Sequence, residues 1–211
     1  MVADMVRTWV AGWAVSRRTP PPVEKPWGFY IETGNPAERG RHVLPAADES
    51  LVRSAAASVD VPRTWMKMPA EPAQIAPWLP AGWVVAREQT GHLMAVDLAA
   101  TTAPGAPEGY RVSVETVGAV VHVRVRDAAG EQAAQGQMAL LGEATVVDRV
   151  QTEEAHQRRG LGTFVMGTLT AHAVDRGATH GILGATDAGR ALYEALGWKK
   201  HATIAESIYR P

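Results

Sequence analysis

The sequence contains no cysteine. This absence excludes disulfides, thiolate metal sites and a cysteine nucleophile, although it does not fix the cellular compartment. The net charge is −1, so the chain also lacks the basic footprint that is typical of nucleic-acid-binding proteins. No apolar run approaches the roughly 20 residues that a membrane-spanning helix needs, and no spacing of potential ligands suggests a metal site. We therefore predict no nucleic-acid partner, no membrane partner and no metal.

The N-terminal residues do not follow the order of a secretory signal peptide, because Asp4 and Arg7 interrupt the apolar segment. Of the 211 residues, 46% are hydrophobic and 20% are charged, which is typical of a globular protein. We therefore expect a cytoplasmic protein with one large domain or two small ones.

Proline and glycine divide the chain into segments. Three prolines at 20–22 end an amphipathic helix that we expect over residues 3–18. Residues 101–109 (TTAPGAPEG) form the clearest linker, since they contain two prolines and two glycines among small residues. These breaks predict an N-terminal sub-domain over residues 1–100, the linker over 101–109 and a core over 110–211. The sequence shows no internal repeat.

The pattern of apolar residues predicts strands and helices in both halves. Before the linker we expect strands at 28–33, 41–44 and 64–68, helices at 50–58 and 71–79, and a hairpin of 82–89 with 91–98 around Thr90-Gly91. After it we expect strands at 110–116, 120–127, 134–141, 145–152 and 179–185, helices from 161 and over 187–196, and a final strand or hairpin over 198–209. Strands followed by late helices predict an α+β fold.

The segment from Thr145 to Arg176 carries the most informative pattern. β-branched residues are followed by Gln157-Arg158-Arg159-Gly160-Leu161-Gly162 and then by apolar residues at steps of four. A helix that starts here presents free N–H groups and a positive dipole to an anion. The two glycines allow a diphosphate to approach closely, and the arginines add positive charge. The spacing fits neither a dinucleotide fingerprint nor a P-loop; a surface turn with two solvated arginines is the alternative.

A second motif lies near the C-terminus, in Leu192-Tyr193-Glu194-Ala195-Leu196-Gly197-Trp198. Its helix starts near Asp187 and stops at Gly197. Together with Gln157, Gly160 and Gly162, this segment resembles the GNAT superfamily of N-acetyltransferases, whose loop motif is Gln/Arg-x-x-Gly-x-Gly/Ala and whose later helix carries Leu-Tyr-x-x-Leu-Gly-Phe/Trp. The resemblance covers residues 110–211.

This resemblance implies a GNAT-like mixed, mostly antiparallel sheet flanked by helices, with an N-terminal α/β sub-domain that shapes the acceptor pocket. It implies acetyl-CoA as co-substrate, bound where two central strands splay apart, and direct transfer to an amine. The residues that it assigns to acetyl-CoA binding are Val150, Thr152, Gln157, Arg158, Arg159, Gly160, Leu161, Gly162 and Thr163.

The resemblance also assigns a catalytic role to Tyr193, whose hydroxyl would reach the thioester sulfur. A phenol with an ordinary pKa of about 10 can donate a proton to the departing CoA thiolate, and backbone N–H groups near Val150 to Thr152 can hold the oxyanion. Tyr193 could instead be a half-buried aromatic residue that covers the sheet. The predicted general bases are Asp148 and Glu153, although a water chain would need neither. Weaker candidates are Glu115, Glu143, His122 and His156.

The N-terminal half contains six of the seven tryptophans. Its opening residues 6–13, with Pro21-Pro22-Val23 and Pro26-Trp27-Gly28, resemble the branch that includes kasugamycin (aminoglycoside) 2'-N-acetyltransferases. This resemblance implies as acceptor the 2'-amine of a small cationic aminoglycoside, whose modification would confer antibiotic resistance. Glu115, Asp148 and Glu153 could attract such a cation. The alternatives are a protein or peptide N-acetyltransferase and a non-catalytic acyl-CoA-binding module. The sequence does not give the oligomeric state, and a homodimer is possible.

Overall fold

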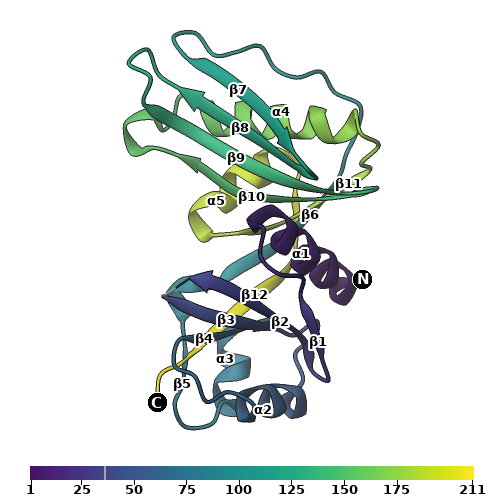
Figure 1. Cartoon of the computed structure of the whole chain (residues 1–211), viewed down its shortest axis with the longest axis vertical. Helices are drawn as coiled ribbons and strands as arrows, with labels where there is room; N and C mark the ends of the chain where they lie inside the picture. Colours follow the sequence, from purple (N-terminus) through teal and green to yellow (C-terminus); the bar gives the residue numbers. More distant parts are fainter. Residues whose placement is uncertain (36) are drawn as a thin grey trace.

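The computed structural model describes residues 1–35 and 37–211, and its strands form one continuous sheet that spans two lobes (Figure 1). The strand order is β1-β2-β3-β4-β12-β6-β11-β10-β9-β8-β7, with β5 paired to β12. Within this sheet β3 runs parallel to β4 and β10 parallel to β11, and the other neighbouring pairs are antiparallel. The predicted fold class, a mixed and mostly antiparallel sheet flanked by helices, is confirmed.

The large lobe contains the two motifs that stood out in the sequence. Its elements are β6 (Gly91–Asp97), β7 (Arg111–Val117), β8 (Val120–Arg126), β9 (Gln132–Leu141), β10 (Ala144–Thr152), α4 (Leu161–Val174), β11 (His180–Ala185), α5 (Asp187–Ala195) and the first half of β12 (Lys199–Tyr209), with 3₁₀ turns at Arg87–Gln89 and Glu154–His156. Alternate residues of β8 (Val121, Val123 and Val125) are fully buried beneath α4, as the two-residue period predicts.

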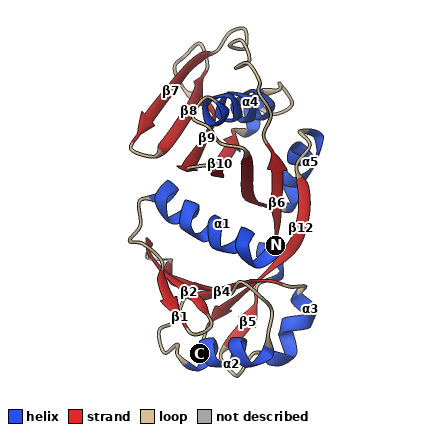
Figure 2. Cartoon of the chain, turned by 90° about the vertical axis from the view of Figure 1, so that its right-hand side faces the viewer, coloured by secondary structure: helices blue, strands red, loops and turns tan. Residues whose placement is uncertain are grey.

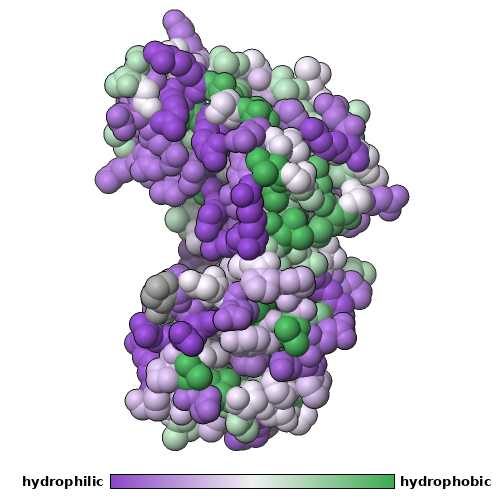
Figure 3. All heavy atoms as spheres, viewed as in Figure 1, coloured by the Kyte–Doolittle hydropathy of each residue, from purple (hydrophilic) through white to green (hydrophobic). Residues whose placement is uncertain are grey.

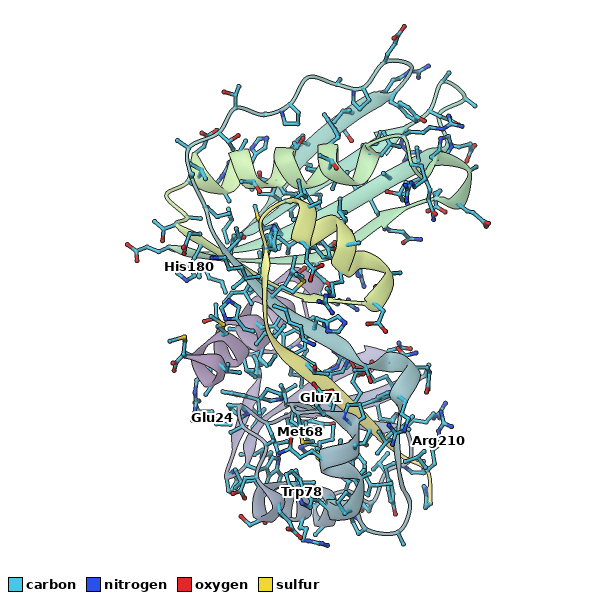
Figure 4. The ribbon with its side chains drawn as sticks, turned by 180° about the vertical axis from the view of Figure 1, so that it is seen from behind. Glu24, Met68, Glu71, Trp78, His180 and Arg210 are labelled. Atoms are coloured by element: carbon cyan, nitrogen blue, oxygen red, sulfur yellow. The ribbon has the colours of Figure 1, made fainter. Side chains whose placement is uncertain are left out.

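The small lobe contains β1 (Val23–Lys25), β2 (Gly28–Asn35), β3 (Glu38–Val43), α2 (Glu49–Ala57), β4 (Thr64–Pro69), α3 (Pro72–Ile75), a 3₁₀ turn (Ala76–Trp78) and β5 (Trp83–Val85). The helix predicted over 71–79 is therefore one short α-helix that continues as a 3₁₀ turn. Pro36, which follows β2, lies outside the described residues. In the view from behind (Figure 4), Met68 and Trp78 mark the core of this lobe, and β12 runs down past Glu71.

Helix α1 (Val2–Arg17) lies between the two lobes (Figure 2). Its buried residues Val6, Val10 and Trp13 follow the helical period, and they pack with residues of both lobes. The fit against β10 is tight, because a Cβ at Gly12 would lie 2.3 Å from Cγ2 of Val146. Glycine at this position therefore lets the helix approach the strand that leads into the predicted acetyl-CoA loop.

The lobes exchange strands, so the sheet does not divide at the predicted linker. β6, from the first hundred residues, lies between β11 and β12. β12 starts against β6 and ends against β4 and β5 of the small lobe. The hairpin expected around Thr90-Gly91 is wrong, because β5 and β6 both pair with β12 and not with each other. A turn signal of two residues says nothing about such distant partners. Residues 101–109 do lack helix and strand, and Pro104 lies against α4 at Gly167.

None of the described helices is long and apolar enough to cross a membrane.

Candidate active site

The central strands β10 and β11 part within the large lobe. They pair only from Ala144–Val147 to His180–Leu183. Beyond Val147, β10 continues to Thr152 along β9, while β11 continues to Ala185 along β6. The edges of the two strands that face each other in this region have no ladder partner in the described chain. The result is a wedge between two strands, with free backbone groups along both sides.

A β-bulge interrupts β10 where the wedge opens. The pairing with β9 shifts register between Asp148 and Gln151, and Arg149 within the bulge has a left-handed backbone with φ 53°. A bulge inserts one unpaired residue and turns local N–H groups away from the ladder. This irregularity coincides with the segment near Val150 whose backbone N–H groups we predicted to hold an oxyanion.

The loop after β10 leads to the start of α4, which no side chain caps. Gly160 is the N-cap of α4 with φ 76°, and no side chain caps it. The N–H groups of Leu161, Gly162 and Thr163 therefore have no partner in the described chain, and they point out of the helix start. Gly162 packs against α5, because a Cβ there would lie 2.9 Å from Cδ2 of Leu192. The helix start can receive an anion, as the glycine pattern predicts.

Of the loop side chains, only that of Leu161 is buried, in the core beneath the sheet. Gln157, Arg158 and Arg159 are exposed. Gln157 Nε2 donates a 3.4 Å hydrogen bond to the carbonyl oxygen of Thr152, and Arg159 Nη1 donates one of 3.2 Å to the hydroxyl of Tyr110. The loop therefore presents two guanidinium groups to solvent beside the helix start. Leu161 contributes its backbone and not its side chain.

Tyr193 lies in the core between α5 and the wedge, packed near Trp198. Burial, together with the nearby negative charge of Asp148, raises the pKa of Tyr193 to about 12. The phenol is therefore protonated at neutral pH and can donate a hydrogen bond. It is also a weaker acid than the unperturbed tyrosine on which the prediction was based.

Asp148 is held by the end of α1. Arg17 donates two hydrogen bonds of 2.8 Å to its two carboxylate oxygens, from Nε and Nη2. Ser16 Oγ donates a third, of 3.1 Å, and Gln137 supports Ser16 in turn. The Asp148 side chain is only 10% exposed. These bonds occupy the carboxylate, so the geometry favours a role in anchoring α1 to the bulge over the predicted role of general base.

Glu153 follows the last residue of β10, where the strand enters the loop. At ~3.3 Å per residue its Cα is about 16 Å along the chain from Asp148. This placement suits a role beside the acetyl-CoA loop better than proton removal at the bulge. Of the weaker candidates, His156 forms a hydrogen bond with Tyr110, Glu115 pairs with Arg124, and Glu143 offers its backbone carbonyl to Thr179.

A cavity of ≈ 280 Å³ opens from the wedge toward the small lobe. Val147, Asp148 and Gly184 to Thr186 line it on the wedge side, and α1, the start of β6 with the 3₁₀ turn before it, and the small lobe with β12 contribute the rest. At its far wall Lys67 Nζ and Glu206 Oε1 form a buried ion pair of 2.6 Å. Burial, followed by the charge of Arg41, lowers the pKa of Lys67. We call this hollow the wedge cavity.

Sequence reasoning missed most residues of the wedge cavity. Arg17 reaches Asp148 across 131 positions, and Lys67 reaches Glu206 across 139. His92 lines the cavity too, with Nε2 2.6 Å from Asp187 and a buried Nδ1 that has no hydrogen-bond partner. No local signal marks these residues, since strand exchange brings them together. No group of three or more histidine, aspartate and glutamate side chains in the described chain could hold a metal.

Comparison with known proteins agrees with this geometry. Residues 125–207 match the family model FR47-like protein. A GCN5-related N-acetyltransferase from Kribbella flavida superposes with a TM-score of 0.70 at 18% identity, covering 99% of this chain and 95% of that one. The chain has the GNAT fold.

Two further structures support this conclusion. A GNAT-family protein from Novosphingobium aromaticivorans is similar with a TM-score of 0.65 and 17% identity, covering 98% of this chain and 96% of that one. A tandem GNAT protein from the clavulanic acid biosynthesis pathway is similar with a TM-score of 0.56 and 14% identity, covering 77% and 68%. At these identities the likeness shows the shared GNAT fold. No curated protein sequence matches the chain.

Proposed function

We propose that this GNAT-fold protein is an N-acetyltransferase that moves an acetyl group from acetyl-CoA to the amine of a small molecule. The observation that carries the proposal is the parting of β10 and β11 at a bulge, on a strand that leads directly to an uncapped helix start. A wedge with free backbone groups can hold an extended amide-containing chain, and the helix start can hold a diphosphate.

In this proposal the free N–H groups of α4 and the guanidinium groups of Arg158 and Arg159 bind the CoA diphosphate. The open edge of β10 near Val150 and Thr152 binds the pantetheine arm, so that the thioester reaches the bulge. Unpaired N–H groups of the bulge then stabilise the oxyanion when the amine nitrogen attacks the carbonyl carbon.

The attack forms the C–N bond. Collapse of the intermediate re-forms the C=O bond, breaks the C–S bond and leaves the sulfur with the electron pair. The Tyr193 hydroxyl donates a hydrogen bond to the developing thiolate. With a pKa raised to about 12, it does so without giving up its proton completely. The thiolate instead takes up a proton equivalent to the one that the amine loses, through water in the wedge cavity. This scheme needs no carboxylate base, in agreement with the pairing of Asp148.

The acceptor predicted from the sequence, a cationic aminoglycoside such as kasugamycin, was suggested by the resemblance of residues 6–13, 21–23 and 26–28 to a branch of acetyltransferases, and this segment contains Trp13 and Trp27. Trp13 has the guanidinium carbons of Arg41 and Arg17 within 4.3 and 4.9 Å of its ring centroid. Trp27 donates a hydrogen bond of 3.0 Å to His42. Because these rings are occupied within the protein, they do not favour an aminoglycoside, which becomes one member of a test panel.

The test is release of CoA thiol from acetyl-CoA with kasugamycin, other aminoglycosides, polyamines, small amino acids and lysine-containing peptides as acceptors. We expect turnover with small amines and a product heavier by one acetyl group. Turnover with peptides alone would establish a protein acetyltransferase instead. Binding of acetyl-CoA without transfer to any amine, in both the wild type and Tyr193→Phe, would indicate a non-catalytic acyl-CoA-binding module.

A further inference from the structure

Two of the three carboxylates that were expected to attract a cationic acceptor, Glu115 and Asp148, are paired with arginines. Glu115 lies 3.4 Å from Nη1 of Arg124, and Asp148 accepts both hydrogen bonds from Arg17 described above. A carboxylate that already faces a guanidinium group adds little attraction for a second cation. The structure therefore gives no support to a cationic acceptor at this end of β10.

A second hollow, of ≈ 560 Å³, lies against the bulge on the α1 side of the sheet. Arg149 of the bulge lines it together with Arg18 at the end of α1 and Arg124 of β8. Figure 3 shows hydrophilic residues where the end of α1 meets the face of β8 to β10. We call this hollow the arginine basin. Arg17, Glu115 and His122 also line it.

The basin has an excess of positive charge. Four arginines (Arg17, Arg18, Arg124 and Arg149) face two carboxylates, Glu115 and Asp148, so two positive charges lack a compensating negative charge. Arg18 and Arg149 form no ion pair with any described acidic residue. The charge of His122 does not add to this excess, because burial and then the charges of Arg124, Arg18 and Arg149 lower its pKa.

The two unpaired arginines are held in an unusual backbone conformation. Arg18 has φ 54° and Arg149 has φ 53°, the left-handed region that residues with a Cβ adopt at a cost of roughly 1–2 kcal/mol. In both cases the surrounding structure imposes the conformation, through the end of α1 and through the bulge. The end of α1 and the bulge of β10 thus each place one arginine, Arg18 and Arg149, in the basin.

We propose that the arginine basin binds a carboxylate or phosphate group of the acceptor, which is therefore an amine that also carries an acidic group. Arginine is the side chain best suited to either anion, because its planar guanidinium group can donate two parallel hydrogen bonds. Arg17 lines both the basin and the wedge cavity. An acceptor that lies along Arg17 has its acidic end in the basin and its amine at the wedge.

This inference rests on the proposed acetyltransferase function and names the substrate class. Matched pairs of acceptors test it: β-alanine against β-alaninamide for the carboxylate, and 2-aminoethyl phosphate against ethanolamine for the phosphate. Each pair shares an amine and differs in the acidic group, and kcat/KM is expressed per unprotonated amine. We expect the acidic member of at least one pair to be preferred about tenfold or more, and the preferred pair identifies the anion.

Two variants with opposite effects on charge test the location. Arg124→Gln removes a positive charge and Glu115→Gln removes the negative charge of its ion-pair partner. Both side chains are well exposed, at 41% and 60%, so both variants should fold. We expect Arg124→Gln to lower kcat/KM for the acidic acceptor about tenfold and Glu115→Gln to raise it severalfold. Values for the uncharged acceptor should change little in both variants.

The two hypotheses fail differently. If acetyl groups are transferred but the amide and ethanolamine are used as well as their acidic partners, the basin inference is wrong and the acetyltransferase stands. If no amine is acetylated, the binding of an acidic amine to the basin still tests the inference. Thermal denaturation with 2-aminoethyl phosphate or with β-alanine, in saturating CoA so that the loop is occupied, should show a Tm increase with at least one of the two that Arg124→Gln reduces and Glu115→Gln enlarges. No increase in the wild type, or equal increases in all three proteins, overturns the inference.

Discussion

Each lobe contains one parallel pair of strands joined through a helix: β10–α4–β11 in the large lobe and β3–α2–β4 in the small lobe. In both, the parallel strands pair over four residues, Ala144–Val147 and Gly40–Val43. β3 ends where this pairing ends, whereas β10 continues to Thr152 and bulges. The same connection therefore produces a wedge only where one strand is longer than its parallel partner.

The helices of the two units also start differently. α2 begins with Asp48, whose carboxylate accepts a 3.1 Å hydrogen bond from the N–H of Leu51. α4 begins with Gly160, which has no side chain to offer. A carboxylate at the first position closes the helix start and makes it negative, whereas a glycine leaves it open to an external anion. One residue thus separates a structural cap from a proposed diphosphate site.

The largest expected effect concerns Tyr193 on α5, the helix that follows the parallel strands of the large lobe. The helix that follows the parallel strands of the small lobe, α3 (Pro72–Ile75), contains no tyrosine. Tyr193→Phe should lower kcat about 100-fold or more, because the thiolate loses its hydrogen-bond donor. Affinity for acetyl-CoA, measured by calorimetry, should not change. Unchanged turnover would remove Tyr193 from the mechanism.

The same residue predicts a pH profile. Because the folded pKa is raised from about 10 to about 12, the phenol remains protonated through pH 10. The rate should therefore rise with pH as the acceptor amine loses its proton and should not decline below about pH 10 on account of Tyr193. A decline with a midpoint below pH 9.5 that disappears in Tyr193→Phe would contradict this assignment.

The second prediction is that α4 loses its anion site when its N-cap residue is changed to the aspartate that caps α2. Gly160→Asp should weaken acetyl-CoA binding about 100-fold, or roughly 2–3 kcal/mol, because a carboxylate then faces the diphosphate. Gly160→Asn is the matched control, since asparagine has nearly the same shape, lacks the charge and tolerates positive φ. Nothing lies within 4 Å of a Cβ at this position, so neither side chain should clash. Equal affinities for the two variants would contradict the proposed diphosphate site.

The third prediction concerns the part of β10 that has lost β11 as a neighbour and contacts α1 instead. Asp148→Asn should lower the free energy of unfolding by about 2 kcal/mol, because Arg17 loses its bidentate partner in a site with little solvent. The control is Glu49→Gln, which removes an ion pair with Arg53 between side chains that are each 51% exposed, and should cost less than about 0.5 kcal/mol. Urea denaturation measures both.

Arg17→Gln distinguishes anchoring from catalysis at Asp148. If Asp148 anchors α1, the two single variants and the double variant should lose similar amounts of stability and of activity. If Asp148 is the general base, Asp148→Asn should lose far more activity than Arg17→Gln. That outcome would restore the role predicted from the sequence.

The smallest effect is expected at the capped helix of the small lobe. Asp48→Ala should reduce the free energy of unfolding by about 1 kcal/mol, because α2 loses its cap. Acetyl-CoA affinity and turnover should be unaffected, since β3 and β4 form no wedge. A change in acetyl-CoA affinity would show that the start of α2 influences the acetyl-CoA site, which would contradict the independence of the two helix starts.

The position of the loop and of the start of α4 was predictable because its signals are local. Gln157, Gly160 and Gly162 lie within six residues, and their chemistry follows from backbone geometry that a short segment determines. The helix of Tyr193 was equally accessible, through a motif that ends at Gly197 and Trp198. The roles of the loop and of Tyr193 in the reaction stay predictions. The fold class and the positions of most elements followed from hydrophobic periodicity, which the sheet and helices of the large lobe obey closely.

The acceptor side was not predictable for the opposite reason. Its walls combine Arg17, Lys67, Asp148 and Glu206, which no local pattern connects. Whether Asp148 is free or paired depends on where α1 docks, and that depends on packing such as the contact of Gly12 with Val146. The boundary at 101–109 was placed from composition, and composition carries no information on strand exchange. The domain division and the cationic acceptor were the inferences that most needed tertiary structure.

The crossing of β12 between the lobes also determines when each lobe can be completed during translation. β4 ends at Pro69, but its partner on β12 begins near Ile204, about 135 residues later. At translation rates of about 5–20 residues per second, roughly 7–27 s separate the two on the ribosome. During that interval the edge of β4 that will receive β12 is unpaired in the nascent chain. The small lobe, although encoded first, is completed last.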